Sequence, residues 1–479
     1  MSQIHLARVL GVLPPSSFQR IQNGWLINSI EPSYDVFDGL ASGSTSSAPF
    51  DRIPAEVEQF VAHKAGTNCI TIDDSGGRFL ISGGADASIH LWDLEATGVG
   101  HAQQPAASLS RSSRGSHTHA ITALFMYPFD PVPSTLVTAS YDKSVKLVSI
   151  TPTSLEPVHN FPLDYAPYTM ALSQLSSAHP LIAIGTAHPA TRLLDLRSGL
   201  GTHSLPGHNG SVYSLSWSPK YDYVLASGAT DGRVLFFDIR RANAAFGTLD
   251  MDDALGVIGG DSHFGAGARG ALDWNTRAHN GPVTGVQWTA DGDKIVTTGH
   301  DQRIRVWDAA TGKNDLVHFG PRIRNERVGP LVPLISPHGC ARPGRELLFW
   351  PNDDGKGDIY VHSLREGNLL NILSTPGVQR SNLQQGKKDS IGKLTSGDRI
   401  NGLIWRTRAA SGQGLELYSA HGDGRIYRWA PPNLEDKFDS QEDSNESTRQ
   451  IAEQGQVKKR KRDLVGDLVA GLSNKSLRV

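Results

Sequence analysis

Short apolar runs separated by turn residues recur along most of this chain. In residues 207–238, SVYSLSW, VLASGATD and GRVLFFD form three such runs, with Asp231 in the tight turn between the last two. Short runs bounded by Gly, Asp and Ser are typical of β-strands. Apolar residues three and five positions after the turn aspartate alternate with other residues, as in a half-buried strand. These pairs are Ile89/Leu91, Val145/Leu147, Val234/Phe236 and Ile304/Val306.

The turn aspartate belongs to a pattern that occurs five times. A Ser or Thr stands four residues before it, a bulky residue six after it, and in four copies a His precedes it by 22 or 23 residues. This set predicts a buried network in which the imidazole bridges carboxylate and hydroxyl, and the hydroxyl accepts an indole N–H. The copies are His63/Ser82/Asp86/Trp92, His119/Thr138/Asp142/Val148, His208/Ser227/Asp231/Phe237, His279/Thr297/Asp301/Trp307 and Ser419/Asp423/Trp429.

The same residue types could form a nucleophilic triad. An enzyme needs one such site, whereas repeats reuse structural parts, so five copies favour a structural module. The Trp-Asp pairs at Trp92 and Trp307 are the signature of WD40 repeats, each of which builds one four-stranded propeller blade.

Blade counting predicts an all-β fold, a seven-bladed WD40 β-propeller with a short N-terminal helical segment and a disordered C-terminal tail. Two blades lack the polar set, and residues 55–62 are expected to close the ring as the outer strand of the last blade, removing its open edge. The predicted domains are an N-terminal extension (1–54), the propeller (55–431) and the tail (432–479). The predicted blades are 63–95, 117–150, 150–207, 207–242, 279–312, 312–397 and 397–430.

The two extensions carry different signals. Residues 14–30 favour a short helix capped by Ser16 or Ser17, with Phe18 and Ile21 on one face. The tail is first acidic and polar, which predicts disorder. It then carries five consecutive basic residues that favour nuclear localisation over a nucleic-acid contact. They are Lys458, Lys459, Arg460, Lys461 and Arg462.

Composition narrows the function classes. The formal net charge is −2, so no global basic field favours nonspecific nucleic-acid binding. The two cysteines, Cys69 and Cys340, support neither a disulfide framework nor a zinc site. No apolar run is long enough to span a bilayer. We expect no catalytic residues, metal, cofactor, small-molecule substrate or membrane partner.

Beyond the WD40 signature, the chain resembles the Cockayne syndrome A family, the substrate receptors of transcription-coupled repair. The likeness covers roughly residues 60–320 and is strongest in GHNGSVYSLSWSPKYDYVLASGATDGRVLFFDIRRA (207–242). Further matching stretches are GRFLISGGADASIHLWDLE (77–95), LIAIGT with LLDLRSG (181–199) and AHNGPVTGVQW with VTTGHDQRIRVWDAATGKN (278–314).

The resemblance implies a non-enzymatic nuclear receptor that links targets to a cullin-4 RING ubiquitin ligase in transcription-coupled nucleotide excision repair. The implied partners are the ligase's damage-specific DNA-binding adaptor, a Swi/Snf-type repair ATPase and the RNA polymerase II complex. It further implies that a Trp-Asp-x-Arg motif contacts the adaptor, here as Phe237-Asp238-Ile239-Arg240 and more weakly through Arg197, aided by the N-terminal helix with Phe18 and Ile21. The opposite face would receive substrate, and its expected lining is Tyr141, Thr230 and His300.

Three alternatives remain. One is a nuclear WD40 scaffold of chromatin or RNA-processing complexes without ligase linkage. The second is an enzyme, which no metal, phosphate-loop or carboxylate-pair signal supports. The third is direct DNA recognition, which the near-neutral charge disfavours.

Overall fold

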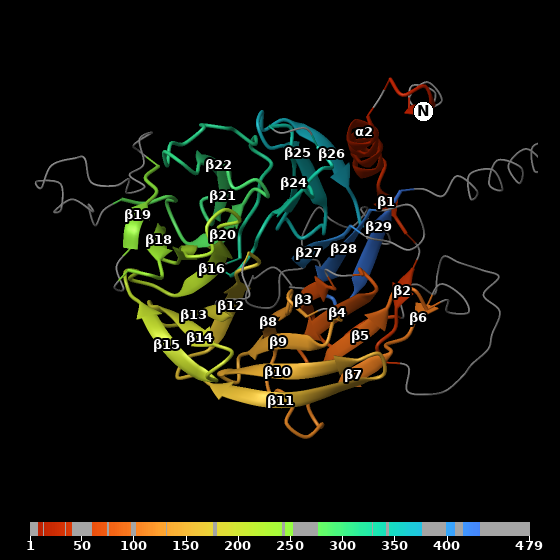
Figure 1. Cartoon of the computed structure of the whole chain (residues 1–479), viewed down its shortest axis with the longest axis vertical. Helices are drawn as coiled ribbons and strands as arrows, with labels where there is room; N and C mark the ends of the chain where they lie inside the picture. Colours follow the sequence, from red (N-terminus) through yellow and green to blue (C-terminus); the bar gives the residue numbers. More distant parts are fainter. Residues whose placement is uncertain are drawn as a thin grey trace, which may run out of the picture. The chain divides into compact units, whose positions relative to one another are not determined.

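Seven small antiparallel sheets stand around a common axis in the computed structural model, as the blades of one propeller (Figure 1). The seven-bladed all-β propeller predicted from the repeats is confirmed, and the predicted tail (432–479) lies outside the described residues. The residues that the structure describes are 8–12, 14–33, 35–40, 60–73, 76–96, 102–130, 132–175, 180–241, 245–251, 276–327, 329–341, 344–375, 399–407 and 415–431.

The blades follow the chain in order, and each runs from an inner first strand to an outer last strand. Blades 3 and 6, predicted from their strand patterns alone, are both present. The strands are, for blade 1, β3 (Thr67–Ile72), β4 (Phe79–Gly84), β5 (Ile89–Asp93) and β7 (Ala107–Leu109); for blade 2, β8 (Ile121–Met126), β9 (Thr135–Ser140), β10 (Ser144–Thr151) and β11 (Ser154–Pro162); for blade 3, β12 (Pro167–Leu172), β13 (Leu181–Thr186), β14 (Thr191–Asp195) and β15 (Leu200–Leu205); for blade 4, β16 (Val212–Trp217), β17 (Val224–Ala229), β18 (Val234–Asp238) and β19 (Ala245–Thr248); for blade 5, β20 (Val283–Trp288), β21 (Lys294–Gly299) and β22 (Arg303–Asp308); for blade 6, β23 (Leu334–Ile335), β24 (Leu347–Pro351), β25 (Ile359–Ser363) and β26 (Leu369–Leu373); and for blade 7, β27 (Ile400–Arg406), β28 (Glu416–His421), β29 (Ile426–Ala430) and β1 (Glu31–Pro32).

The hydrophobic core is divided among the junctions between blades. Because successive side chains of a strand point to opposite faces, each blade offers one apolar face to each neighbour. Ile81 and Leu91 of blade 1 face blade 2, whereas Leu80 and Trp92 face blade 7. The described residues form seven such apolar clusters, one at every junction. The apolar alternation in the repeats therefore corresponds to contacts between blades.

Tryptophans on three inner strands add a polar link across the junctions. The indole N–H of Trp217 donates to the Ala171 carbonyl of the preceding blade at 3.1 Å. Trp288 and Trp405 make the equivalent bonds at 3.2 and 3.0 Å. Each bond satisfies a half-buried indole N–H and fixes the distance between neighbouring inner strands.

The ring is closed by a strand that the sequence did not reveal. Strand β1 pairs antiparallel with β29, with Glu31 opposite Ala430 and Pro32 opposite Trp429 (Figure 1). The predicted closing strand at residues 55–62 is wrong, because the outer neighbour of β29 is β1. The predicted start of the propeller domain at residue 55 therefore leaves out β1, the outermost strand of blade 7. Residues 55–59 lie outside the described part of the chain.

The closing segment continues into blade 1. Strand β2 (Val36–Phe37) pairs parallel with β6 (Ala102–Gln103), a short strand that follows blade 1. The Phe37 ring is buried and packs edge-on against two other rings. Its centroid lies 5.2 Å from that of Trp92 and 6.2 Å from that of Tyr418. Strands β1 and β2 thus add the outermost links to the junction between blades 7 and 1, where the Asn401 amide also donates to the Thr67 carbonyl.

A buried ionic network supports this closure. Arg428, where the repeat pattern predicts an apolar residue, bonds both Glu416 and Asp35. Glu416 is 1% exposed and also accepts bonds from Arg406 (3.0 Å) and the Tyr418 hydroxyl (2.8 Å). Burial raises the pKa of Glu416, but the charges and hydrogen bonds of Arg428 and Arg406 outweigh burial and hold it below its usual value. A charge is tolerated here because it is fully paired.

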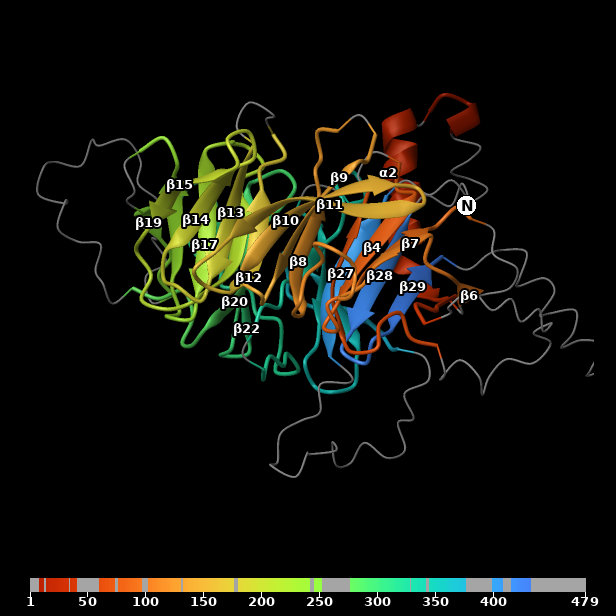
Figure 2. The same cartoon turned by 90° about the horizontal axis from the view of Figure 1, so that it is seen from below.

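The predicted N-terminal helix is present as α2 (Pro15–Asn28), and it rises from one face of the propeller (Figure 2). The predicted capping is wrong. The N-cap is Pro14, no side chain caps the helix, and Ser16 and Ser17 lie inside its first turn. Ile27 and Ile30, at and just beyond the end of the helix, are buried against the cluster between blades 6 and 7. No described helix is long and apolar enough to cross a membrane.

We expect Glu416→Ala to lower the free energy of unfolding by about 3–5 kcal/mol, because Arg406 and Arg428 would keep buried charges without their shared partner. Urea unfolding followed by tryptophan fluorescence measures this loss. Glu366→Ala is the matched control, since the Glu366 carboxylate is exposed and, within the described part of the chain, bonds only Asn368. That variant should stay within about 0.5 kcal/mol of wild type. Equal losses in the two variants would contradict a special role for Glu416.

Candidate functional site

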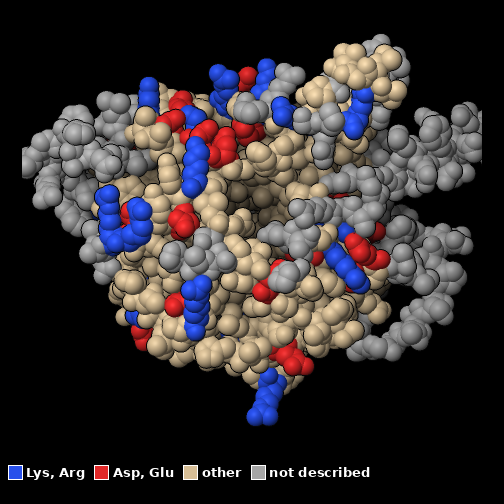
Figure 3. Space-filling model, viewed as in Figure 1, with Lys and Arg blue, Asp and Glu red and all other residues tan. Residues whose placement is uncertain are grey.

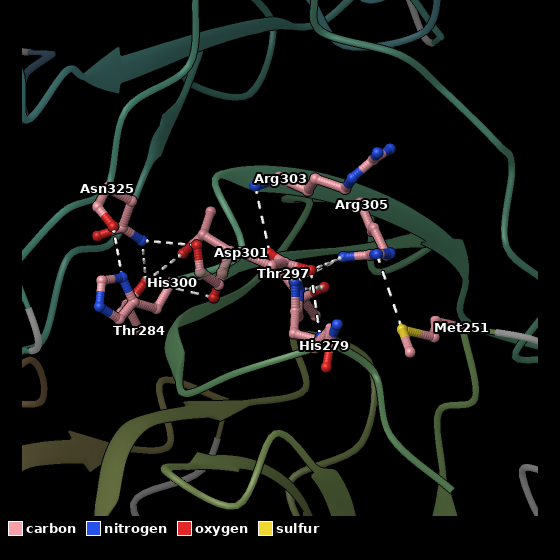
Figure 4. Close-up of polar contacts among 12 residues, drawn as sticks. Met251, His279, Thr284, Thr297, His300, Asp301, Arg303, Arg305 and Asn325 are labelled. Carbon is pink, nitrogen blue, oxygen red and sulfur yellow. Dashed lines mark hydrogen bonds and ion pairs between the residues drawn. The ribbon is translucent and has the colours of Figure 1, made fainter. Parts of the chain in front are cut away.

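The polar set of blade 5 joins all four predicted side chains, of which Figure 4 labels His279, Thr297 and Asp301. His279 Nδ1 lies 2.9 Å from Asp301 Oδ1, and its Nε2 lies 2.8 Å from the Thr297 hydroxyl oxygen. That oxygen accepts the Trp307 indole N–H at 2.9 Å. His279, Thr297 and Trp307 are each 0% exposed. The network therefore ties the turn, the second strand and the third strand of the blade together.

Blade 1 contains the same set with one hydroxyl added. Trp92 donates to the Ser82 hydroxyl at 2.9 Å, and Ser82 meets His63 Nε2 at 2.8 Å. On the other side of the ring, Ser88 lies between His63 Nδ1 (2.7 Å) and Asp86. The ring passes close to the backbone, so a Cβ at Gly84 would overlap the imidazole of His63.

In blade 2 the bridging imidazole is His117. Its Nδ1 lies 2.9 Å from Asp142 Oδ2 and its Nε2 lies 2.9 Å from the Thr138 hydroxyl oxygen. The prediction of His119 for this place is wrong. His119 is exposed, and among the described residues its ring meets only the neighbouring Thr118 hydroxyl, at 3.0 Å. Spacing from the aspartate does not distinguish two histidines that stand two residues apart.

Blades 4 and 7 depart from the full pattern in different ways. In blade 4, His208 contacts Ser227 at 2.6 Å and Asp231 at 3.2 Å, while Phe237 replaces the indole and is fully buried. In blade 7 the imidazole comes from the second strand itself. His421 Nε2 contacts the Ser419 hydroxyl at 2.9 Å, and Ser419 accepts the Trp429 indole N–H at 2.9 Å.

The turn aspartates are ionised. Burial opposes this in Asp86, Asp142 and Asp301, but hydrogen bonds from the facing histidine and neighbouring groups hold the pKa of each well below its usual range. Burial lowers the pKa of His279, although Asp301 opposes it. For His421, burial followed by the nearby charge of Arg425 lowers the pKa to about 3. Neutral rings satisfy hydrogen bonds without a buried charge.

These networks are built to hold blades rather than to react. The hydroxyls are fully buried, so no substrate carbonyl can approach them. Among the described residues, no group of three His, Cys, Asp or Glu side chains is placed to hold a metal ion. Cys69 and Cys340 are free, and burial raises the pKa of the Cys340 thiol to about 11. The functional candidates are therefore the two faces of the propeller.

The first candidate lies where β18 ends. The Arg240 guanidinium donates from Nε and Nη2 to the two oxygens of Asp238, at 3.0 and 2.8 Å. It stacks on the Tyr223 ring with its central carbon 3.2 Å from the ring centroid. The Arg240 side chain is still 58% exposed, while Phe237 beneath it is buried. Asp238 and Tyr223 thus hold an arginine at the surface in one orientation.

Arg197 occupies the equivalent turn of blade 3. Its backbone N–H donates to Asp195 at 2.9 Å, and its side chain is exposed near Tyr127. The same turn in blade 6 has Ser363 in place of the aspartate, followed by Arg365. Of these three turns, blade 4 holds its arginine most firmly.

Helix α2 stands on the same face as these turns. In an antiparallel blade, the turn after the first strand and the turn after the third strand lie at one end. Arg20 of α2 lines a small pocket with residues 289–291 and 336–341, which follow the first strands of blades 5 and 6. Phe18 and Ile21 are half-buried, and Arg8 lies 5.0 Å from the centre of the Phe18 ring. Around them, apolar side chains exposed by 45% or more are Val9, Leu10, Val12 and Trp25.

The opposite face carries the predicted substrate residues in the turns between second and third strands. Tyr141 is 46% exposed and begins a row of three aromatic rings. Its ring centroid lies 5.9 Å from that of Tyr168, which lies 5.1 Å from that of Tyr213. Thr230 is half-buried and its N–H bonds the Ser211 carbonyl. His300 Nδ1 lies 2.8 Å from the Asn325 carbonyl oxygen (Figure 4). The structure groups Tyr141 with two tyrosines that the sequence did not single out.

A cavity of about 710 Å³ lies between the inner strands of all seven blades, near the ends of the first strands. Its walls include Trp217, Trp288, Met126 and Met170. Charged side chains of both signs surround the central hollow in the face drawn in Figure 3. Lys458–Arg462 lie outside the described residues.

Comparison with known proteins agrees with the repeat architecture. Residues 55–93, 109–149, 200–238 and 272–308 match the family model "WD40: WD domain, G-beta repeat". These segments correspond to blades 1, 2, 4 and 5, the blades with a His–Ser/Thr–Asp set. The chain therefore carries WD40 repeats on a seven-bladed propeller, an architecture typical of protein scaffolds and adaptors.

Curated relatives are similar over about half of this chain. It is 29% identical to "WD repeat-containing protein ATCSA-1" of Arabidopsis thaliana, covering 54% of this chain and 69% of that protein. It is 28% identical to "Ribosome biogenesis protein YTM1" of Chaetomium globosum (52% and 54%). It is 27% identical to "Anaphase-promoting complex subunit cdc20" of Dictyostelium discoideum (57% and 50%). The chain spans about half the length of the last two.

We expect His117→Ala to lower the free energy of unfolding by about 2–3 kcal/mol, because the Thr138 hydroxyl and Asp142 carboxylate would lose a buried partner. His119→Ala is the matched control and should stay within about 0.5 kcal/mol of wild type. Chemical denaturation of both variants measures the difference. The reverse order would show that His119, not His117, completes blade 2.

Acid should weaken the fold through His421. Its folded pKa of about 3 lies below the value of about 6.5 expected when unfolded, so protons bind the unfolded chain first and stability falls as pH drops below about 6.5. Replacing His421 with Asn keeps a hydrogen-bonding group and removes the titration. The stability difference between wild type and H421N should therefore shift by about 2 kcal/mol against wild type between pH 7 and pH 5. Denaturation at both pH values tests this, and a pH-independent difference would contradict it.

Proposed function

We propose that this chain is a non-enzymatic substrate receptor of a cullin-4 RING ubiquitin ligase, acting in transcription-coupled nucleotide excision repair in the nucleus. The observation that carries the proposal is the held arginine at Asp238–Arg240, on the face from which α2 rises. Both are elements that the resemblance to the Cockayne syndrome A family implies for adaptor docking.

The geometry of Arg240 suits a contact between proteins. Two of its donors are engaged by Asp238 and one face by Tyr223, which leaves its Nη1 edge and its outer face for a partner. An arginine that is ordered before binding loses little side-chain entropy when it docks. Helix α2 packs against blades 6 and 7, away from Arg240 but on the same face. The exposed Trp25 of α2 and Leu10 of the preceding segment add an apolar anchor of the kind that dominates interfaces.

The proposed mechanism is effective concentration. The face with Arg240 and α2 would bind the damage-specific DNA-binding adaptor, and the face with Tyr141 would bind the target. A rigid propeller that holds both makes ubiquitin transfer by the other subunits close to an intramolecular step. The targets that we propose are a Swi/Snf-type repair ATPase and the RNA polymerase II complex. The basic run Lys458–Arg462 supports a nuclear location.

The similarity to ATCSA-1 supports this reading over the enzyme and DNA-binding alternatives. The similarity to the ribosome biogenesis protein YTM1 favours a second candidate, a nuclear scaffold without ligase linkage. The two candidates differ in one measurable property, which is binding to the ligase adaptor through Arg240.

We expect Arg240→Ala combined with Arg197→Ala to reduce recovery of the adaptor in a pull-down by at least about tenfold, since a central interface arginine contributes about 2 kcal/mol or more. Arg365→Ala is the matched control, because Arg365 occupies the same turn of blade 6 without a preceding aspartate. Unchanged recovery with the double variant would overturn the assignment of these residues. No recovery by the wild-type chain would favour the scaffold candidate.

A further inference from the structure

Blade 5 has an open outer edge. Every other blade places a fourth strand against its third strand, but within the described residues β22 pairs along its length only with β21. A single bridge, Trp307 to Asn314, begins a fourth strand that does not continue. An unpaired strand edge is a ready template for another extended chain.

The edge stays open because the chain turns away from it. The Asp315 N–H donates to the Val306 carbonyl at 2.9 Å, and the next residue, Leu316, has φ +55° and is 73% exposed. The Asn314 side chain accepts the Leu316 N–H at 2.9 Å and fixes this turn. Strand periodicity directs the N–H and C=O of Ile304 to the same edge as the Val306 carbonyl. A cavity of about 460 Å³ occupies the space beyond.

One wall of this cavity is basic. Arg303 and Arg305 lie on one face of β22, and Figure 4 shows both side chains extending to the same side, away from Asn325 and His300. Arg305 bonds Asp301, whose carboxylate is already held by His279 and backbone N–H groups. Arg303 is exposed and has no carboxylate partner among the described residues.

A third arginine closes the end of the cavity. Arg324 Nη1 donates to the Gln302 side chain and to the carbonyls of Pro321 and Ile323, each at 3.1 Å. All three acceptors are neutral oxygens. Asp301 is thus the only carboxylate among the described residues that line the cavity, against three guanidinium groups.

The other wall is apolar. Phe319 and Ile323 line the cavity from the departing segment and belong to the buried cluster between blades 5 and 6. Side chains of an added strand would alternate between the two walls. The side toward Arg303 and Arg305 calls for carboxylates, and the side toward Phe319 and Ile323 calls for aliphatic groups.

We propose that the outer edge of blade 5 binds an extended acidic peptide of a partner protein, which adds a fourth strand to β22. Backbone bonds to Ile304 would supply register, and alternating acidic and aliphatic side chains would supply specificity. This site lies on blade 5, away from Arg240 and Tyr141, and reaches the turn that follows His300. It does not depend on the function proposed above.

A labelled peptide of about eight residues that alternates Glu and Val tests the proposal by fluorescence anisotropy with the full chain. We expect binding that Arg303→Glu weakens by about tenfold or more. Among the described residues, the Arg303 side chain forms no hydrogen bond or ion pair, so this variant should fold normally. Arg365→Glu, at an exposed site on blade 6, should bind as wild type does. A Lys–Val peptide and an N-methylated Glu–Val peptide should both bind weakly, because they lose the charge match or the backbone bonds. Hydrogen exchange should slow at 303–306 when the Glu–Val peptide is present.

Several results would overturn the proposal. One is the absence of measurable binding by the Glu–Val peptide at about 1 mM. Another is that Arg303→Glu binds this peptide as tightly as wild type does. A third is that the N-methylated peptide binds as tightly as the unmodified one. Protection on another blade would also overturn it. Dimerisation that Arg303→Glu abolishes would assign the edge to a second copy of this chain. Binding that appears only after removal of residues 252–275 would assign the edge to that segment of the chain.

Discussion

Closure of the ring between the last blade and the first is the constraint on which the propeller depends. Each blade has two apolar faces, and six junctions between consecutive blades leave one face of blade 1 and one of blade 7 to be covered. The seventh junction is made by β1, by Phe37 between Trp92 and Tyr418, and by the Asn401 amide on the Thr67 carbonyl at 2.9 Å. Without it, two hydrophobic sheet faces and a strand edge would meet water.

Polar and apolar contacts stabilise different parts of this ring. The apolar clusters join blades to each other, while the His–Ser/Thr–Asp networks hold the strands of one blade together. Individual parts can therefore be exchanged. Phe237 fills the indole position of blade 4 with apolar volume, and in blade 6 the Trp350 indole bonds Asn352 at 3.2 Å instead of a hydroxyl. The described turns contribute mainly their aspartates to these networks, with Ser88 added in blade 1, so their other positions can acquire binding residues.

The repeats made the fold class and five of the seven blades predictable, because the spacing of Ser/Thr, Asp and the bulky residue reports a local network within one blade. The ring-closing strand could not be found this way. Glu31–Pro32 is two residues long and has no periodicity, and its partner β29 lies almost 400 residues away. The His119 error had a similar origin, since sequence spacing cannot state which of two neighbouring histidines points inward.

The candidate sites were less predictable than the fold. The sequence indicated the Asp-x-Arg turn and Tyr141 as candidate residues. It could not indicate that Arg240 stacks on Tyr223, or that Tyr141 forms a row with Tyr168 and Tyr213, because these contacts join different strands or blades. Arg428 looked like a defect in the apolar pattern. Arg428 is accommodated because it bonds Glu416 and Asp35. Asp35 comes within reach of Arg428 only when the ring is assembled. Interactions between distant segments were missed wherever neither segment carried a signal of its own.

The pairing of β1 with β29 has a consequence for how the protein is made. A ribosome releases residues 31–37 long before it releases their partner strand, so the N-terminal segment must wait while six blades form. During that interval the outward face of blade 1, including Leu80 and Trp92, lacks its neighbour. Contacts of such sequence separation are slow to form and leave intermediates prone to association. Nascent chains interrupted before residue 426 therefore expose the apolar face of blade 1. Formation of the final blade is the step that covers this face and ends the tendency to associate.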